Sequence, residues 1–313
     1  MNKLKIINSV SDYNPKTDRD VRITHTDLSD LTVFDTPAKK SNCFFVGDEH
    51  QTLRAKDYNV IYNPQTNLVY GVVGSDYKLV NHAEILEPIT NRIISEFGTN
   101  IEVIDTSYDF GKFASRKFIF NDINANLNSK SSAQIDDIIK ASYTLFNGIG
   151  GNKSLGGLHD AYRLNCLNGQ MSVEKIARMF FRHTKNLDLD YFVNLSHEVN
   201  EKFNQLFIQQ QIMSTKDVTF LEARNILETT IAKSRTNKKN EVVDHPKMDV
   251  ILNQFLKETN NLGYSLYAFY NALTYWYTHI DSSKGSIYST SNSRLNDLYM
   301  VFNSPSFKNI YAQ

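Results

Sequence analysis

The sequence has few cysteines and no spacing that would gather them into a site. Cys43 and Cys166 are the only two in 313 residues, and they lie far apart. The sequence therefore suggests neither a disulfide framework nor a thiolate metal site, because both require closely patterned cysteines. Cys166 falls in an apolar segment, where we expect it to be a small buried hydrophobe. A reducing cytoplasm fits both cysteines.

Long apolar segments and an excess of one charge are also missing. No apolar run approaches the ~20 residues that a membrane-spanning helix needs, and the N-terminal segment MNKLKIINSVSDYN has no apolar core of a signal peptide. We expect a soluble cytoplasmic protein without membrane contact. The net charge is zero, with 34 Lys and Arg against 34 Asp and Glu. Any binding of nucleic acid must therefore come from a local basic patch.

Motifs of the common enzyme classes are absent as well. The sequence contains no Gly-x-Ser-x-Gly, no His-Glu-x-x-His, no dinucleotide fingerprint and no EF-hand loop. The triplet Asp48-Glu49-His50 has the composition of a turn, since no partner spacing fixes a metal or a general base. His159-Asp160 and His183 could share a site, but one sequence does not show that they are close. We expect no catalytic residue, no metal and no cofactor, and binding is favoured over catalysis.

What is present predicts an α+β fold. A hydrophobic content of 41% and an aromatic content of 12% are enough for a core. Residues 1–41 are polar, with short strand-like pieces at 4–7 and 31–34, and are interpreted as an arm that packs on the domain or on a neighbouring subunit. Residues 42–171 are predicted to form an antiparallel β-rich core with a crossing helix. Residues 172–313 are predicted to be helical, with a loop at 234–246.

The β-rich part follows from period-two alternation and turn chemistry. Strands are predicted at residues 59–62, 68–73, 101–105, 112–120 and 138–146. Apolar residues at helical spacing predict a helix over 82–97 that ends at Gly98. Residues 121–134 are predicted to be a polar loop. In the C-terminal part, helices are predicted over 191–213, 248–256 and 266–280, and Thr219 with Glu222 forms a capping box before a further helix.

A glycine-rich segment at 148–157 precedes a predicted strand at 158–167. It contains Gly148, Gly150, Gly151, Gly156 and Gly157 around Lys153. Glycine is used where the backbone takes positive φ or approaches another group closely. Two interpretations stay open. One is a phosphate-contacting loop through Lys153, although the spacing is not that of a P-loop, and the other is the tip of a hairpin.

A basic helix is predicted after this strand. The Asn168-Gly169 pair signals a turn, Ser172 is placed as an N-cap, and helical spacing then puts Lys175, Arg178, Arg182 and Lys185 on one face. One interpretation is a solvated helix face. The other is a phosphate-contacting surface, because a row of like charges is unfavourable without a partner. Arg163 and His183 lie at the two ends of this region.

Aromatic residues accompany basic ones in two predicted elements. Strand 112–120 carries Lys112 and Arg116 among phenylalanines, a pattern found in single-strand binders that stack bases and pair phosphates. Phenylalanine in a strand is also an ordinary core residue. The helix over 266–280 has aromatic side chains all round, and we interpret it as buried between layers or at a subunit contact. A base-stacking surface is the alternative.

Two segments resemble a known family. The run RLNCLNG at 163–169, followed by Arg182-His183-Thr184, and the upstream segment VYGVVGSDYKLVN at 69–81 are similar to the phage/plasmid-like family known as domain of unknown function 932. The resemblance covers roughly residues 58–195. Gly169 departs from the family pattern, which often has a small aliphatic residue or Thr there. The resemblance implies a mobile-element origin, and with it a location in a bacterial host cell, but no particular activity.

Two functional hypotheses follow. The first is a nucleic-acid-binding protein, such as a single-strand DNA-binding or annealing factor in replication or recombination. Its expected contacts are made by Lys153, Arg163, Asn168, Lys175, Arg178, Arg182, His183, Lys185, Lys112 and Arg116. The alternative is a non-enzymatic structural or inhibitory protein that binds host or virion proteins. Self-association into a homo-oligomer is compatible with both.

Overall fold

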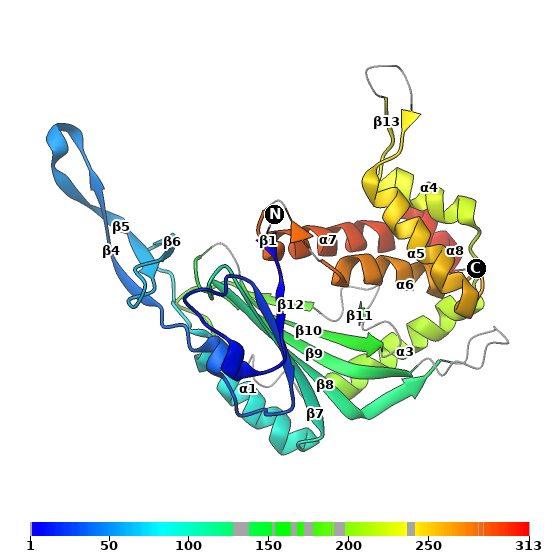
Figure 1. Ribbon diagram of the computed structural model, residues 1–313, viewed down its shortest axis with the longest axis horizontal. Helices are drawn as coiled ribbons and strands as arrows, with labels where there is room; N and C mark the ends of the chain where they lie inside the picture. The colour runs from blue at the N-terminus through cyan, green and yellow to red at the C-terminus, as the bar shows by residue number, and fades with distance from the viewer. Residues whose placement is uncertain are drawn as a thin grey trace.

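A long, mainly antiparallel sheet forms the centre of the molecule (Figure 1). The computed structural model describes residues 2–127, 138–151, 154–163, 168–171, 178–188, 190, 198–236, 242–280, 282–283 and 285–312. The strand order is β11-β10-β9-β8-β7-β3-β2, and β12 also pairs with β10. The strands are β2 (Lys5–Ile7), β3 (Val21–His25), β7 (Ile101–Tyr108), β8 (Phe113–Asn126), β9 (Ile138–Gly148), β10 (Leu155–Arg163), β11 (Asn168–Met171) and β12 (Arg178–Phe181). Only the β2–β3 pair among them is parallel.

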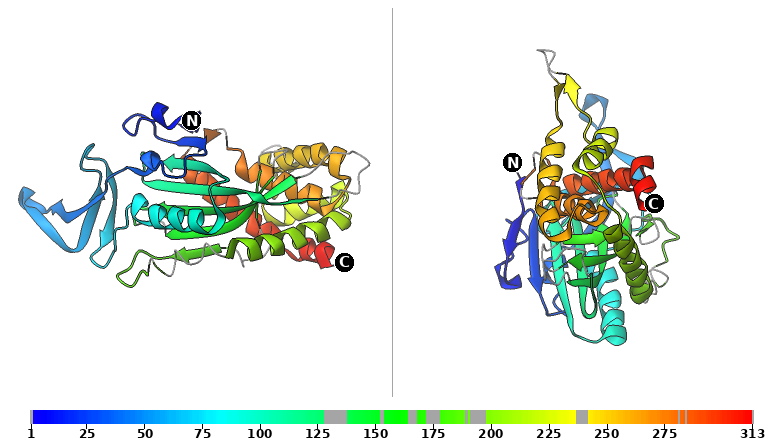
Figure 2. Two further views of the ribbon diagram at one scale, coloured as in Figure 1. Left: turned by 90° about the horizontal axis from the view of Figure 1, so that it is seen from below. Right: turned by 90° about the vertical axis from the view of Figure 1, so that its right-hand side faces the viewer.

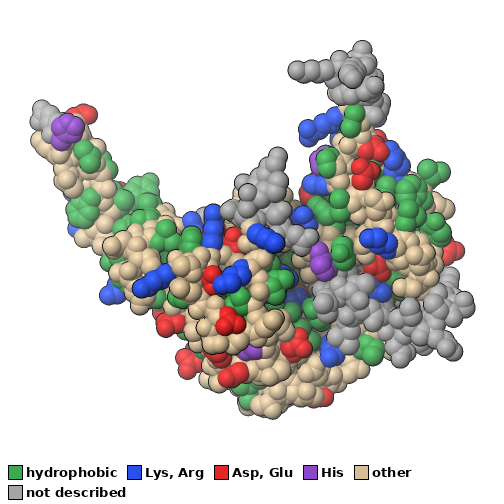
Figure 3. All heavy atoms as spheres, viewed as in Figure 1, with side chains coloured by type: hydrophobic (Ala, Val, Ile, Leu, Met, Phe, Trp, Pro, Cys, Tyr) green, Lys and Arg blue, Asp and Glu red, His purple; other side chains and the backbone are tan. Residues whose placement is uncertain are grey.

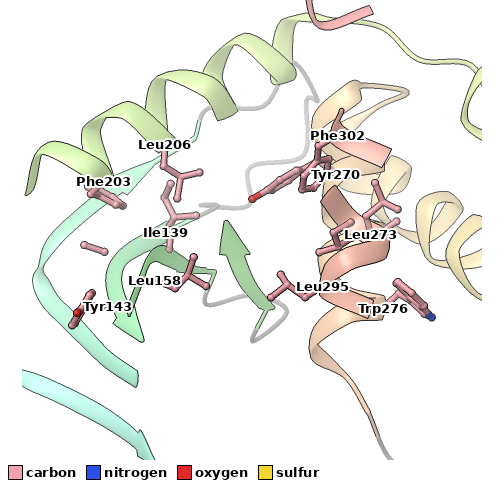
Figure 4. Close-up of a cluster of buried hydrophobic side chains, with 14 of the residues drawn as sticks. Ile139, Tyr143, Leu158, Phe203, Leu206, Tyr270, Leu273, Trp276, Leu295 and Phe302 are labelled. Carbon is pink, nitrogen blue, oxygen red and sulfur yellow. The ribbon is translucent and has the colours of Figure 1, made fainter. Parts of the chain in front are cut away.

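Two helices cover one face of this sheet (Figure 2). Helix α1 (His82–Phe97) buries Ile85, Ile89 and Ile93 against it. The helix ends at Gly98, whose φ of 79° is a conformation that glycine adopts without strain. Helix α3 (Val199–Thr215) packs on β9 and β10 through side chains that include Phe203, as the close-up in Figure 4 shows.

The C-terminal helices form a second layer at the β11 end of the sheet. They are α4 (Phe220–Thr230), α5 (Pro246–Leu262), α6 (Leu266–Thr278), α7 (Ile287–Phe302) and α8 (Pro305–Ala312). Helix α6 is the central member, with Tyr267, Phe269 and Tyr270 at most 1% exposed. Tyr270 and Leu273 of α6 point into the cluster that Phe302 and Leu295 complete (Figure 4). The prediction that this aromatic helix is buried between layers is therefore confirmed.

A hairpin arm projects from the opposite end of the molecule (Figures 1 and 2). We use this name for β4 (Lys39–Val46) and β5 (Thr52–Tyr62), which pair with each other, while β6 (Val69–Gly74) pairs with the base of β5. The tip is a short 3-10 turn, Asp48–His50, which confirms the turn interpretation of that triplet. Phe44, Phe45 and Val46 are each more than half exposed.

The sequence correctly predicted the α+β class, the helix over 82–97 and the strands at 101–105, 112–120 and 138–146. Three predictions about residues 1–126 were wrong. Residues 1–41 are not a separate arm, because β2 and β3 are strands of the central sheet and Val21 and Ile23 are fully buried. Residues 32–34 form a 3-10 turn rather than a strand. Residues 121–126 are not a loop, because β8 continues to Asn126 opposite β9.

Short strands complete the fold. In the predicted loop at 234–246, β13 (Arg235–Thr236) pairs with β14 (Val242–Val243), and residues 237–241 lie outside the described residues. Strand β1 (Asn2–Lys3) pairs with β15 (Ser282–Ser283), which joins the N-terminus to the segment before α7. The capping box of Thr219 and Glu222 is present at the start of α4, as predicted.

Candidate nucleic-acid interface

The glycine segment joins the arm to the sheet. Strands β9 and β10 pair as an antiparallel hairpin, which supports the hairpin-tip interpretation. A Cβ on Gly71 would lie 2.1 Å from the Gly150 carbonyl oxygen, and a Cβ on Gly151 would lie 2.3 Å from Val73. Gly151 also has a φ of 80°. These glycines allow β6 and the loop after β9 to approach each other at the backbone, so close packing explains them without a bound phosphate.

Two distant segments meet beside this contact. The ring of His183 stacks on that of Tyr77, with centroids 5.2 Å apart. The Lys78 amide donates to the His183 carbonyl at 3.2 Å, and Thr184 forms a β-bridge with Tyr77. Burial lowers the pKa of His183 and raises that of Tyr77, so both side chains are neutral near pH 7. The two segments that resemble the family therefore form one contact at the base of the arm.

Five cations lie around this contact, and we call them the basic junction: Lys40, Lys78, Lys112, Arg182 and Lys185. Lys40 and Lys78 are fixed by backbone carbonyls, because Lys40 Nζ donates to Ser75 and Tyr77 oxygens at 2.9 and 2.8 Å, and Lys78 Nζ donates to that of Leu187 at 3.0 Å. Neutral carbonyls orient these ammonium groups without removing their charge.

Arg182 and Lys185 are the most accessible members of the basic junction. Both side chains are exposed, and Lys185 forms an ion pair with Asp76, itself 76% exposed. An exposed pair of this kind contributes little to stability and exchanges readily for another anion. Lys112 lies against Gly150, with its ammonium 5.8 Å from the Phe113 ring centroid. On the face of the molecule that Figure 3 shows, basic and acidic side chains are mixed between the arm and the helical half.

Arg116 does not belong to a surface, contrary to the prediction that it contacts nucleic acid. Its side chain is 0% exposed, and Nε and Nη2 donate to the two oxygens of Asp105 at 2.8 and 2.7 Å. Nη1 donates to the Leu28 carbonyl at 2.8 Å, and His25 also contacts Asp105. This cluster lies under α1 and ties β8 to the N-terminal segment, so Arg116 has a structural role.

Arg163 is also buried, at the far end of β10. Its Nη1 donates to Glu258 of α5 at 2.8 Å, and its guanidinium lies 6.0 Å from the Tyr267 ring centroid. The side chain is 2% exposed, so a phosphate cannot reach it in this conformation. His183, at 6% exposed, likewise positions its neighbours instead of meeting solvent.

The predicted basic helix is wrong where the structure describes it. Arg178–Phe181 form β12, which pairs with Leu155–Leu158 of β10, and Asn168 lies in β11 opposite Arg163 instead of in a turn. Lys153 and Lys175 lie outside the described residues, as do the predicted N-cap at Ser172 and the start of the helix. Of the predicted residues that the structure describes, it brings together Lys112, Arg182, His183 and Lys185.

Lys40 and Lys78 were missed by the sequence prediction. Lys78 falls within the upstream segment that resembles the family, and this placement was the available signal. No local pattern in the sequence pointed to Lys40, because the carbonyls that hold it belong to Ser75 and Tyr77, 35 and 37 residues along the chain. In the described part of the chain, no three His, Cys, Asp or Glu side chains are grouped to hold a metal. No described helix is long and apolar enough to cross a membrane.

Comparison with known proteins identifies a family. No curated protein and no solved structure matches the chain. The family described as a domain of unknown function, DUF932, matches residues 69–299, which include β6, the basic junction apart from Lys40, and most of the helical half. The matched range is well over half of the 313 residues and extends past the segments in which the resemblance was seen. The chain belongs to the DUF932 family.

Proposed function

We propose that this protein is a mobile-element nucleic-acid-binding protein that binds single-stranded DNA, as a single-strand binding or annealing factor in replication or recombination. The observation that supports the proposal is the basic junction, where chain segments far apart in sequence place five cations around the base of the arm. In a chain of zero net charge, such a local cluster is what would attract a polyanion.

The held positions of the cations favour a phosphate backbone as their ligand. Lys40 and Lys78 are oriented by carbonyls, so little side-chain entropy is lost when they meet a phosphate. Arg182 and Lys185 follow one another along the segment after β12, a spacing suited to successive phosphates. Contacts of this kind fix a strand without reading its sequence.

The test is fluorescence anisotropy of the full chain with single-stranded and duplex oligonucleotides over a salt series. The variant Arg182→Glu/Lys185→Glu reverses two exposed charges of the basic junction. The matched control Lys257→Glu/Lys308→Glu makes the same charge change at exposed positions of α5 and α8. We expect wild type and control to bind single strands with a steep salt dependence, and we expect the log–log slope to fall in the variant by about 0.7 for each phosphate that is no longer neutralised. Absence of binding at low salt, or an equal fall in affinity for variant and control, would reject the proposal.

A second candidate function rests on the hairpin arm. A two-stranded ribbon is marginally stable alone in water, yet this one exposes Phe44, Phe45 and Val46. Such a ribbon suits a protein that docks on another protein, including a second copy of this chain in a homo-oligomer.

A further inference from the structure

A cavity lies on the sheet face opposite α1 and α3. Its volume is about 180 Å³. The floor is built from alternate residues of neighbouring strands, among them Ile104, Lys117 and Thr144, and the roof is the end of α6 and the start of α7, through Tyr277 and Asn292. Several lining side chains are partly exposed, so the cavity is open to solvent on one side.

The acidic group of this cavity is already occupied. Asp160 is 4% exposed, and Lys117 Nζ lies 2.6 Å from its Oδ2. The hydroxyls of Ser142 and Thr144 donate to the same carboxylate at 2.6 and 3.4 Å. These three donors use most of the roughly four acceptor positions of a carboxylate. Asp160 therefore fixes Lys117 in place and offers no strong acceptor to a ligand.

The charged groups of the cavity other than Asp160 are Arg22 and Lys117, which only donate. Arg22 lines the cavity from β3, and its Nε is buried with no hydrogen-bond partner among the described residues. Lys117 has two further N–H groups. A buried donor without a partner is costly, and a ligand oxygen would relieve that cost. The cavity is thus suited to a molecule that presents acceptor atoms at one edge.

The remaining walls are aromatic and aliphatic, and the size admits one ring. Tyr108, Tyr162 and Tyr277 line the cavity together with Ile104 and Leu158. Burial and the nearby Asp160 charge raise the pKa of Tyr277, so its hydroxyl stays neutral. A cavity of about 150 Å³ in another protein binds benzene. A six-membered ring therefore fits here, whereas a fused two-ring system would need more space.

We propose that this cavity binds a pyrimidine base, whose ring carbonyl oxygens accept from Arg22 Nε and Lys117 and whose faces contact the tyrosine rings. If the base belongs to a bound single strand, the cavity is part of the proposed DNA-binding site, and the inference then rests on the proposed function. A single-stranded base is the least costly to move out of its stack. A free pyrimidine nucleotide offers the same ring and is the other source of this ligand.

The test separates the cavity from the basic junction. Titration calorimetry and saturation-transfer NMR of the full chain are done with thymidine 5′-monophosphate and with 2′-deoxyadenosine 5′-monophosphate. We expect the thymidine nucleotide to bind and show ring-proton saturation transfer, and the adenosine nucleotide to bind at least tenfold more weakly. Arg22→Met, which retains the length of the side chain without its donors, should reduce thymidine nucleotide affinity at least tenfold, while the exposed control Lys39→Met should leave it unchanged. Equal affinities for the two nucleotides, no binding, or no effect of Arg22→Met would overturn the proposal.

Two further measurements show whether the bound base comes from a strand or from a free nucleotide, and whether a variant has misfolded. Ser115→Phe fills the cavity from β8 and should abolish binding of the thymidine nucleotide; if it unfolds by circular dichroism, the Arg22→Met result decides. Arg182→Glu/Lys185→Glu should bind oligonucleotides more weakly and retain its affinity for the free nucleotide. If the protein binds oligothymidine more tightly than oligoadenosine, and if Arg22→Met removes this preference, the base in the cavity comes from a bound single strand. Binding of the free thymidine nucleotide without any oligonucleotide binding supports the cavity and rejects the proposed function.

Discussion

His183 lies against Tyr77, with ring centroids 5.2 Å apart and planes 23° from parallel. These residues are more than one hundred positions apart, and each belongs to a segment that resembles the family. Their contact joins the segment after β12 to the base of the arm. Arg182 and Lys185 flank it, so two neutral rings hold two exposed cations in place. Within the family segments, His183 and Tyr77 provide the packing, and Arg182 and Lys78 provide positive charge beside it.

Loss of this stack should weaken DNA binding indirectly. We expect His183→Ala to free the segment at 182–187, to raise its amide hydrogen exchange, and to reduce single-strand affinity several-fold, because the cations would no longer be held in fixed positions. A matched control is His279→Ala, which removes a similar stack on Tyr275, 4.0 Å between centroids, at the end of α6. Reduced affinity without increased exchange at 182–187 would contradict a positioning role.

The buried histidine of α1 should make stability depend on pH. His82 Nε2 lies 2.8 Å from the Gly111 carbonyl oxygen, and its Nδ1 lies 3.2 Å from the Asn147 amide, which fits a neutral ring protonated on Nε2. Burial lowers the pKa of His82 from 6.5 to about 4. The unfolded chain therefore takes up a proton before the folded one, so stability is full above pH 6.5 and falls as the pH drops towards 4.

The size of this effect can be measured by urea unfolding between pH 7 and 5. A pKa difference of this size corresponds to about 3 kcal/mol of stability lost by pH 4, at roughly 1.4 kcal/mol per unit. We expect His82→Gln to be less stable at pH 7. Its free energy of unfolding should also vary less with pH, by a slope that corresponds to as much as one bound proton. An unchanged slope in the variant would show that His82 does not titrate differently in the two states.

The Arg163–Glu258 pair should be structural. Arg163→Met would leave the buried Glu258 carboxylate without this partner, although Gln254 still donates to it at 2.9 Å. Removing one partner of a buried pair costs about 3–5 kcal/mol. We expect that loss in urea unfolding, and we expect Arg163→Met/Glu258→Leu to recover most of it because no buried charge remains. A double variant as unstable as the single one would show that the guanidinium acts through other contacts, such as the Tyr267 ring.

Local patterns predicted the elements whose determinants are local. The helix over 82–97 has its apolar spacing and its Gly98 terminus within one short segment, and the hairpin at 59–73 contains its own turn. The predicted basic helix failed because β10 offers Arg178–Phe181 a strand edge, and this pairing overrode the helical spacing. The burial of Arg163 was invisible because Glu258 is 95 residues away. The cavity was invisible for the same reason, since its walls come from separate strands and helices.

The exposed face of the arm should control self-association. Phe44 and Phe45 are 56% and 51% exposed in the single chain, so Phe44→Ser/Phe45→Ser should change the stability of the monomer little. If two copies bury these rings, the variant removes that apolar surface from the interface and dissociates. We expect light scattering after size exclusion to show an oligomer for wild type and a monomer for the variant. The control Ile208→Ser/Met300→Ser removes two similarly exposed apolar side chains from α3 and α7 and should retain the oligomer. If the wild type is a monomer, the arm does not mediate self-association and a different protein remains its candidate partner. If the arm variant is still an oligomer, the interface lies elsewhere on the molecule.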